Sequence, residues 1–136
     1  WMQERASKVF LVATANSVSE LPPEMMRKGR MDEVFFVDLP GAPARAEIFR
    51  LHLGRRGEDP SKFDLATLAR ESDGFSGAEI EQAVVSAVYT ALAGGHTVGA
   101  QDILRELKNT RPLSMVMAEK VAELREWAAE RTVPAN

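Results

Sequence analysis

The chain has 136 residues, of which 45% are hydrophobic and 27% charged, a balance typical of one globular domain rather than of a disordered or membrane-spanning protein. The formal net charge of −3 at pH 7 disfavours a general nucleic-acid-binding protein, and the lack of cysteine in this chain excludes disulfides and zinc–thiolate sites. His52 and His96 are too far apart in sequence to suggest a metal site. We expect a cytoplasmic protein without a structural metal, and, since the chain opens with Trp1, part of something longer.

Two apolar runs in the first forty residues predict strands. KVFLVATAN at 8–16 is a continuous apolar and β-branched run, which predicts a strand buried on both faces in a parallel sheet. VFFVDL at 34–39, closed by Pro40 and Gly41, predicts a second strand, and LPPEMM at 21–26 predicts a short helix between the two. Because two strands alone cannot bury a hydrophobic face, further strands must come from elsewhere.

From residue 43 onward the sequence pattern is helical. PARAEIFRLHL at 43–53 has proline in its first turn and predicts a helix that links the two halves of the chain. Asp64 is suited to cap a short helix. Ser76 and Glu79 have the spacing of a capping box ahead of the longest apolar stripe, and a glycine pair that begins at Gly94 ends that helix.

Two more helical patterns follow, over residues 98–109 and 115–131. In both, the apolar residues recur on one face at helical spacing. Together with the preceding helices they predict a helical bundle that covers roughly residues 60–132. Residues 133–136 are expected to be frayed.

Asn16 follows the first predicted strand, at the end where ligands bind in open α/β sheets. Its amide can both donate and accept hydrogen bonds, so it is suited to hold a phosphate oxygen and to orient a water molecule. The alternative is an asparagine that begins a loop turn.

A basic segment, MMRKGRM at 25–31, precedes the second predicted strand. Gly29 allows a tight turn there, and Arg27 and Arg30 can then project on one side of it. Two guanidinium groups suit a multiply charged phosphate better than a single carboxylate. The alternative is a solvated loop.

Several motifs, taken in order, resemble the AAA family of ATPases over about residues 1–110. VFLVATAN resembles the sensor-1 strand, and LPPEMMRKGRMDEVFFVDLP resembles the arginine-finger segment. PARAEIFRLHL is similar to the linker helix, and DGFSGAEIEQAV looks like the start of the lid helix. The Pro-Pro-Glu sequence, Lys28 and LREWAAE resemble a poorly characterised AAA subgroup known from cyanobacteria and plastids.

The resemblance implies a fold and a domain division. Residues 1–53 correspond to the C-terminal part of the α/β subdomain, a remnant of a parallel-sheet P-loop NTPase core that ends with the linker helix. Residues 54–136 correspond to an all-α lid formed by a helical bundle. The chain as a whole is expected to be mostly α-helical.

The resemblance also implies roles for three polar residues that precede the second predicted strand. Asn16 would help to position the attacking water within its own subunit. Arg27 and Arg30 would act as arginine fingers for the ATP of a neighbouring subunit, in a ring that is usually a hexamer in the family. An arginine supplied from outside a site can be worth about 10³–10⁵ in the rate of phosphoryl transfer.

Four residues, two in the linker helix and two at the start of the lid helix, carry over as nucleotide contacts. Ile48 and His52 fall at the family positions near adenine, and Gly77 and Ala78 fall where the lid helix approaches the nucleotide. From the residues alone, packing against the sheet is the favoured interpretation of His52.

No G-x-x-x-x-G-K-[ST] loop and no apolar strand ending in Asp-Glu occurs in this sequence. The ligands for Mg²⁺ are therefore absent from this chain, which should not hydrolyse ATP alone. We expect a module of an ATPase that uses ATP with Mg²⁺ to remodel a protein partner. The alternatives are a non-catalytic helical protein-interaction module and, less in keeping with the acidic balance, a clamp-loader-like DNA factor.

Overall fold

A computed structural model describes residues 10–15, 17, 21, 22, 24 and 31–135 of the chain. The elements in chain order are β1 (Phe35–Phe36), α1 (Ala42–Arg55), the 3-10 helix η1 (Pro60–Lys62), α2 (Leu65–Glu71), α3 (Gly77–Ala93), α4 (Ala100–Asn109), α5 (Leu113–Val116), α6 (Ala118–Ala129) and β2 (Val133–Pro134). The predicted class is confirmed, since a short parallel sheet accompanies a mostly helical chain. Within these residues, no helix is both long enough and apolar enough to span a membrane.

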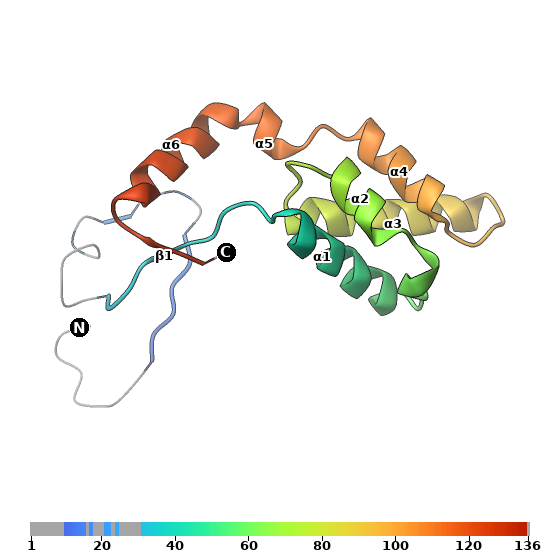
Figure 1. Ribbon diagram of the computed structural model, residues 1–136, viewed down its shortest axis with the longest axis horizontal. Coiled ribbons are helices and arrows are strands. Elements are labelled where there is room, and N and C mark those ends of the chain that lie inside the picture. Colours follow the sequence, from blue (N-terminus) through green and yellow to red (C-terminus); the bar gives the residue numbers. More distant parts are fainter. Residues whose placement is uncertain (1–9, 16, 18–20, 23, 25–30, 136) are drawn as a thin grey trace.

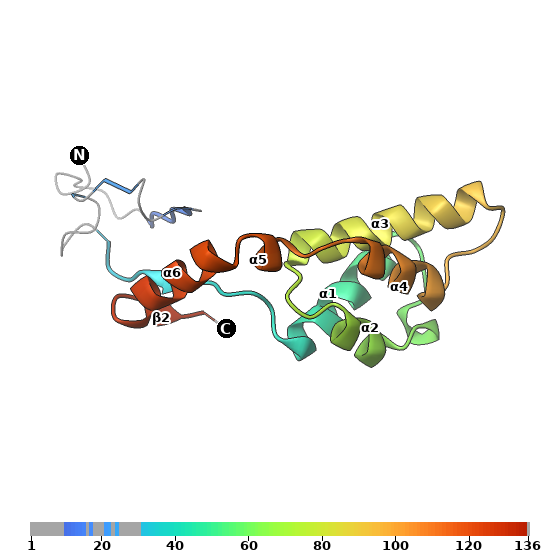
Figure 2. The ribbon, with the colours of Figure 1, turned by 90° about the horizontal axis from the view of Figure 1, so that it is seen from above.

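Helices α1 to α4 form a bundle around one hydrophobic core (Figures 1 and 2). Helix α1 packs against α2 and α3, and α4 packs against α3. Phe49 and Leu53 of α1, Ile80 of α3 and Ile103 of α4 have no exposed surface. The helix predicted over 43–53 is therefore confirmed, and its apolar face is part of the core of the bundle.

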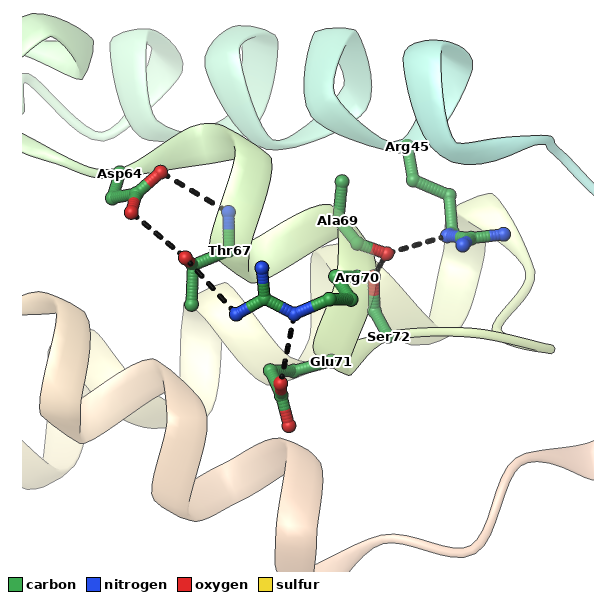
Figure 3. Close-up of polar contacts among 7 residues, drawn as sticks. All are labelled: Arg45, Asp64, Thr67, Ala69, Arg70, Glu71 and Ser72. Carbon is green, nitrogen blue, oxygen red and sulfur yellow. Dashed lines mark hydrogen bonds and ion pairs between the residues drawn. The ribbon is translucent and has the colours of Figure 1, made fainter.

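The predicted helix starts are also confirmed. The Asp64 carboxylate accepts a hydrogen bond from the backbone N–H of Thr67 at 3.1 Å, which caps α2 (Figure 3). At α3, the Ser76 hydroxyl accepts from the N–H of Glu79 at 3.3 Å, and the Glu79 carboxylate accepts from the N–H of Ser76 at 2.8 Å. This reciprocal pair satisfies two N–H groups that a helix start otherwise leaves without partners.

Arg45 joins α1 to the end of α2 (Figure 3). Its side chain is buried, and its Nε donates to the carbonyl oxygen of Ala69 at 2.9 Å. Its Nη1 donates to the carbonyl oxygen of Pro40 at 2.8 Å, and its Nη2 lies 3.1 Å from Oδ1 of Asp73. One side chain therefore fixes the segment before α1, the start of α1 and the end of α2 relative to one another.

The strand predicted over 8–16 is not formed in its described part. Residues 10–15 have no strand structure, and Phe10 and Val12 are 92% and 72% exposed. A parallel strand of this composition needs neighbours that pair with its edges and cover its faces, and nothing in the described chain covers it. Of the second predicted strand, only Phe35–Phe36 are in strand form. The helix predicted over 21–26 lies largely outside the described residues.

The end of the chain differs from the prediction. The pattern over 115–131 gives two helices, α5 and α6, separated at Met117, and α6 leads away from the bundle toward β1 (Figure 1). The bundle therefore consists of α1 to α4 and stops short of residue 132. The terminal residues, expected to be frayed, instead form β2, which pairs in parallel with β1 in the register Phe35 to Val133.

Candidate functional site

Helix α1 and the first turns of α3 carry the four predicted nucleotide contacts. A Cβ built on Gly77 would lie 3.6 Å from Cδ1 of Ile48, and Ala78 follows Gly77 at the start of α3. One turn further along both helices, Nδ1 of His52 lies 3.6 Å from Oε1 of Glu81. Ile48 and His52 of α1 therefore lie beside Gly77 and Glu81 of α3, and these residues define one surface across the two helices.

The backbone of Gly77 is accessible at this surface because it carries no side chain. A methyl group there would make an ordinary van der Waals contact with Ile48, whereas a branched side chain would extend further over the surface. Ile48 is half-buried and Ala78 is exposed, so an apolar side chain and open backbone are presented together. This combination suits the face and edge of a planar, mostly apolar group.

The N-terminus of α3 already holds a negative charge. One oxygen of the Glu79 carboxylate accepts from the N–H and the hydroxyl of Ser76, and the other accepts from the N–H of Leu113 at 2.7 Å. Partial burial acts to raise the pKa of Glu79, but the hydrogen bonds from Ser76 and Leu113 outweigh it and lower the pKa below its ordinary value. A phosphate group would meet repulsion here, so this surface favours an uncharged part of a ligand.

Glu81 is a residue that the sequence reasoning missed, although its position one turn after Gly77 was a signal. The His52 side chain is 15% exposed and that of Glu81 is 47% exposed. Their separation is longer than a hydrogen bond and corresponds to an ion pair when the imidazole is protonated.

Three predicted site residues, Asn16, Arg27 and Arg30, lie outside the described residues. The structure does not place them, and their roles stay predictions. Among the residues that it does describe, no group of three histidine, cysteine, aspartate or glutamate side chains is placed to hold a metal ion.

A second feature that the sequence did not reveal is a cleft of about 440 Å³ between the start of α1 and α6. Gly41 and Arg45 line one wall, and Val121 and Ala122 of α6 line the other. Arg125 also lines it, and its guanidinium group pairs with Asp38. Every buried polar side-chain atom of the described residues has a hydrogen-bond partner.

Comparison with known proteins identifies the helical part of the chain. The family model of the AAA+ lid domain matches residues 62–103, which run from the end of η1 into α4. These residues are an AAA+ lid domain. Gly77 and Ala78 lie inside the lid, and Ile48 and His52 lie in the helix that precedes it and packs against it.

Individual relatives extend the similarity over nearly the whole chain. An uncharacterised AAA domain-containing protein ycf46 of Guillardia theta is 42% identical over 130 residues, which are 95% of this chain and 26% of the relative. The ATP-dependent zinc metalloprotease FtsH of Mycoplasmopsis synoviae is 38% identical over 92 residues, 67% of this chain and 13% of that protein. A proteasome-activating nucleotidase of Saccharolobus solfataricus is 31% identical over 118 residues, 87% of this chain and 30% of that protein.

These matches confirm the resemblance to AAA proteins that the motifs indicated, including the narrower resemblance to the plastid-type subgroup. The lid of this chain is therefore related to the lids of ATPases. The chain spans about a quarter of the length of the ycf46 relatives that it matches.

Proposed function

We propose that this chain supplies the sensor-1, arginine-finger and lid portion of a cytoplasmic AAA ATPase that uses ATP with Mg²⁺ to remodel a protein partner. The observation that supports the proposal is the position of Ile48 of the linker helix beside Gly77 at the start of the lid helix, where a Cβ built on the glycine would lie 3.6 Å from Cδ1 of Ile48. This is where the family resemblance puts the adenine, and the local surface suits an uncharged, planar ligand.

The residues of this surface have distinct tasks in the proposal. Ile48 offers an apolar contact to one face of the adenine, and the open backbone at Gly77 and Ala78 allows close approach of the base. His52, its Nδ1 beside Glu81, offers Nε2 as a polar contact for the base edge. The bound nucleotide supplies the phosphoryl group, and the ligands for its magnesium come from residues outside this chain.

Asn16, Arg27 and Arg30 complete the proposed machinery. Asn16 orients a water molecule within its own subunit, and the two arginines reach the site of the neighbouring subunit in a ring, taken to be a hexamer by family resemblance. Guanidinium groups stabilise the negative charge that develops on a transferring phosphoryl group.

A protein is the favoured partner. Two relatives are named for a metalloprotease and for activation of the proteasome, and both names refer to action on proteins or their machinery. The net charge of −3 gives no support to a nucleic-acid partner.

The adenine surface can be tested in the intact protein with a fluorescent ADP analogue. His52→Ala is expected to raise the Kd about tenfold, because it removes a polar contact from a mostly buried position. Tyr89→Ala, on the exposed far part of α3, is the matched control and should bind normally. Unchanged binding by the His52 variant would contradict the proposed surface.

The arginine-finger proposal needs a separate experiment. Arg30→Ala in the intact protein should bind ATP but lose hydrolysis, and rings that mix this variant with a P-loop variant should recover part of the activity. Loss of binding without recovery in mixed rings would contradict a finger that acts on a neighbour. An intact protein that binds no adenine nucleotide at all would favour the alternative, a non-catalytic protein-interaction module.

A further inference from the structure

The C-terminal part of the chain returns to the segment that precedes α1. Helix α6 runs away from the bundle, and the end of the chain lies beside β1 (Figure 1). The N–H of Val133 donates to the carbonyl oxygen of Val34 at 2.9 Å, and the N–H of Ala135 donates to that of Phe36 at 3.0 Å. Two segments from opposite ends of the described chain are thus joined by backbone hydrogen bonds in a defined register.

An ion pair between Arg125 and Asp38 also joins α6 to the segment that precedes α1. The guanidinium group of Arg125 on α6 donates two hydrogen bonds to the Asp38 carboxylate. Nε donates to Oδ2 at 2.8 Å, and Nη2 donates to Oδ1 at 2.9 Å. This hydrogen bonding lowers the pKa of Asp38 below its ordinary value. Two parallel N–H···O contacts fix the relative orientation of the two groups, which a single contact would not do.

The pair is too exposed to hold the two segments together alone. The side chains of Arg125 and Asp38 are 50% and 33% exposed, and exposed ion pairs add little to stability. Its contribution comes in combination with the strand pairing, because both join the α6–β2 part of the chain to the segment before α1. The ion pair and the backbone hydrogen bonds therefore hold the same two segments together.

The N-terminal end of the segment formed by α5 and α6 is attached to the bundle as well. The Ser114 hydroxyl donates to the carbonyl oxygen of Gly74, in the loop before α3. The cleft between α1 and α6 lies between these two attachments. The lid is thus joined to β1 twice, covalently through residues 37–41 and non-covalently through α6 and β2.

We propose that residues 118–135 form a strap that fastens the lid to the β1 segment, and that Asp38 and Arg125 are positioning residues that set the orientation of the lid through it. The strap itself does not depend on nucleotide. Its effect on ATP hydrolysis rests on the proposed function, because a lid that changes orientation on a weakened strap would present Ile48 and Gly77 differently to the rest of the site.

The strand pairing can be tested by cross-linking in the intact protein. Phe35 and Val133 are directly paired, within the Cα separation that a disulfide spans, and this chain has no cysteine of its own. The double variant F35C/V133C should form an intramolecular disulfide on mild oxidation, faster than the off-register pair F35C/A135C. Absence of the cross-link, or cross-linking only between molecules, would overturn the strap.

The ion pair can be tested by charge exchange. Asp38→Arg and Arg125→Asp should each speed hydrogen exchange at the amides of Val133 and Ala135 by roughly threefold to tenfold, since each places like charges together. The double exchange should restore protection, while Lys120→Asp, at an exposed charge on the same helix, should leave exchange unchanged. Unchanged exchange in the single variants would overturn the pair's role in the strap.

Turnover distinguishes a positioning role from a structural one. In the intact protein, the single charge variants should lower kcat and raise the nucleotide Kd, because the displaced lid carries Gly77, and the double exchange should recover both. Exchange rates that respond while kcat does not would overturn the positioning role. If the wild-type protein bound no ATP, the proposed function would be contradicted but the strap would not, because the cross-linking and hydrogen-exchange experiments need no nucleotide.

Discussion

Replacing Arg45 by alanine should destabilise the lid by about 2–4 kcal/mol. The side chain is 7% exposed and donates to two backbone carbonyl oxygens, of Pro40 and Ala69. A hydrogen bond from a charged donor contributes about 1.5–3 kcal/mol. The cost at Ala69 is reduced because its oxygen also accepts from the Ser72 hydroxyl at 3.2 Å. The ion pair to Asp73 adds little, since that carboxylate is 87% exposed.

Urea denaturation followed by circular dichroism measures this loss, which for a bundle of this size corresponds to a fall in Tm of roughly 10–20 °C. Arg45→Met keeps the aliphatic packing and isolates the hydrogen bonds, so it should recover only part of the loss. Asp73→Asn is the control for the ion pair and should cost less than about 0.5 kcal/mol. An Arg45→Ala variant as stable as wild type, or an Asp73 variant equally damaged, would refute the reasoning.

Three further predictions concern the lid core and its loops. Phe49→Ala should cost about 3–5 kcal/mol in urea denaturation, because the ring is fully buried among helices; a cost under 1 kcal/mol would contradict the described core. Gly74→Ala should cost more than about 1 kcal/mol, since φ is +78° and the new Cβ would lie 2.8 Å from the Ser114 hydroxyl oxygen; adding Ser114→Gly removes the close contact but not the backbone strain, so Tm should recover only in part. The free energy of unfolding should fall as the pH drops below about 4.3, the ordinary pKa of glutamate, because unfolded Glu79 takes up its proton before the folded carboxylate with its lowered pKa does. Glu79→Gln should flatten this dependence, and an unchanged acid profile would show that other carboxylates cause it.

The helix starts could be predicted because their signals are local. The caps at Asp64 and Ser76 need only residues within one turn, and the structure forms both. The closeness of Ile48 to Gly77 agrees with the family resemblance, which implied that each of them lies near the nucleotide.

Other features depend on contacts between distant parts of the chain. The strand expected over 8–16 needs neighbours that the described residues do not provide, so its apolar composition alone was misleading. Arg45 looked like one of several charged residues on a helix, and its role follows only from the position of the Ala69 carbonyl oxygen. The pairing of β1 with β2 has no local signal, because each strand has two residues and the second contains proline.

Photolabelling with 8-azido-ATP tests most directly whether α1 and α3 form the adenine surface. The intact protein would be irradiated with the probe, digested, and mapped by mass spectrometry, with excess unlabelled ATP as the competition control. Labelling of peptides from Ala42–Arg55 or Gly77–Ala93 that ATP suppresses is the predicted result. Competable labelling confined to other parts of the protein would contradict the account.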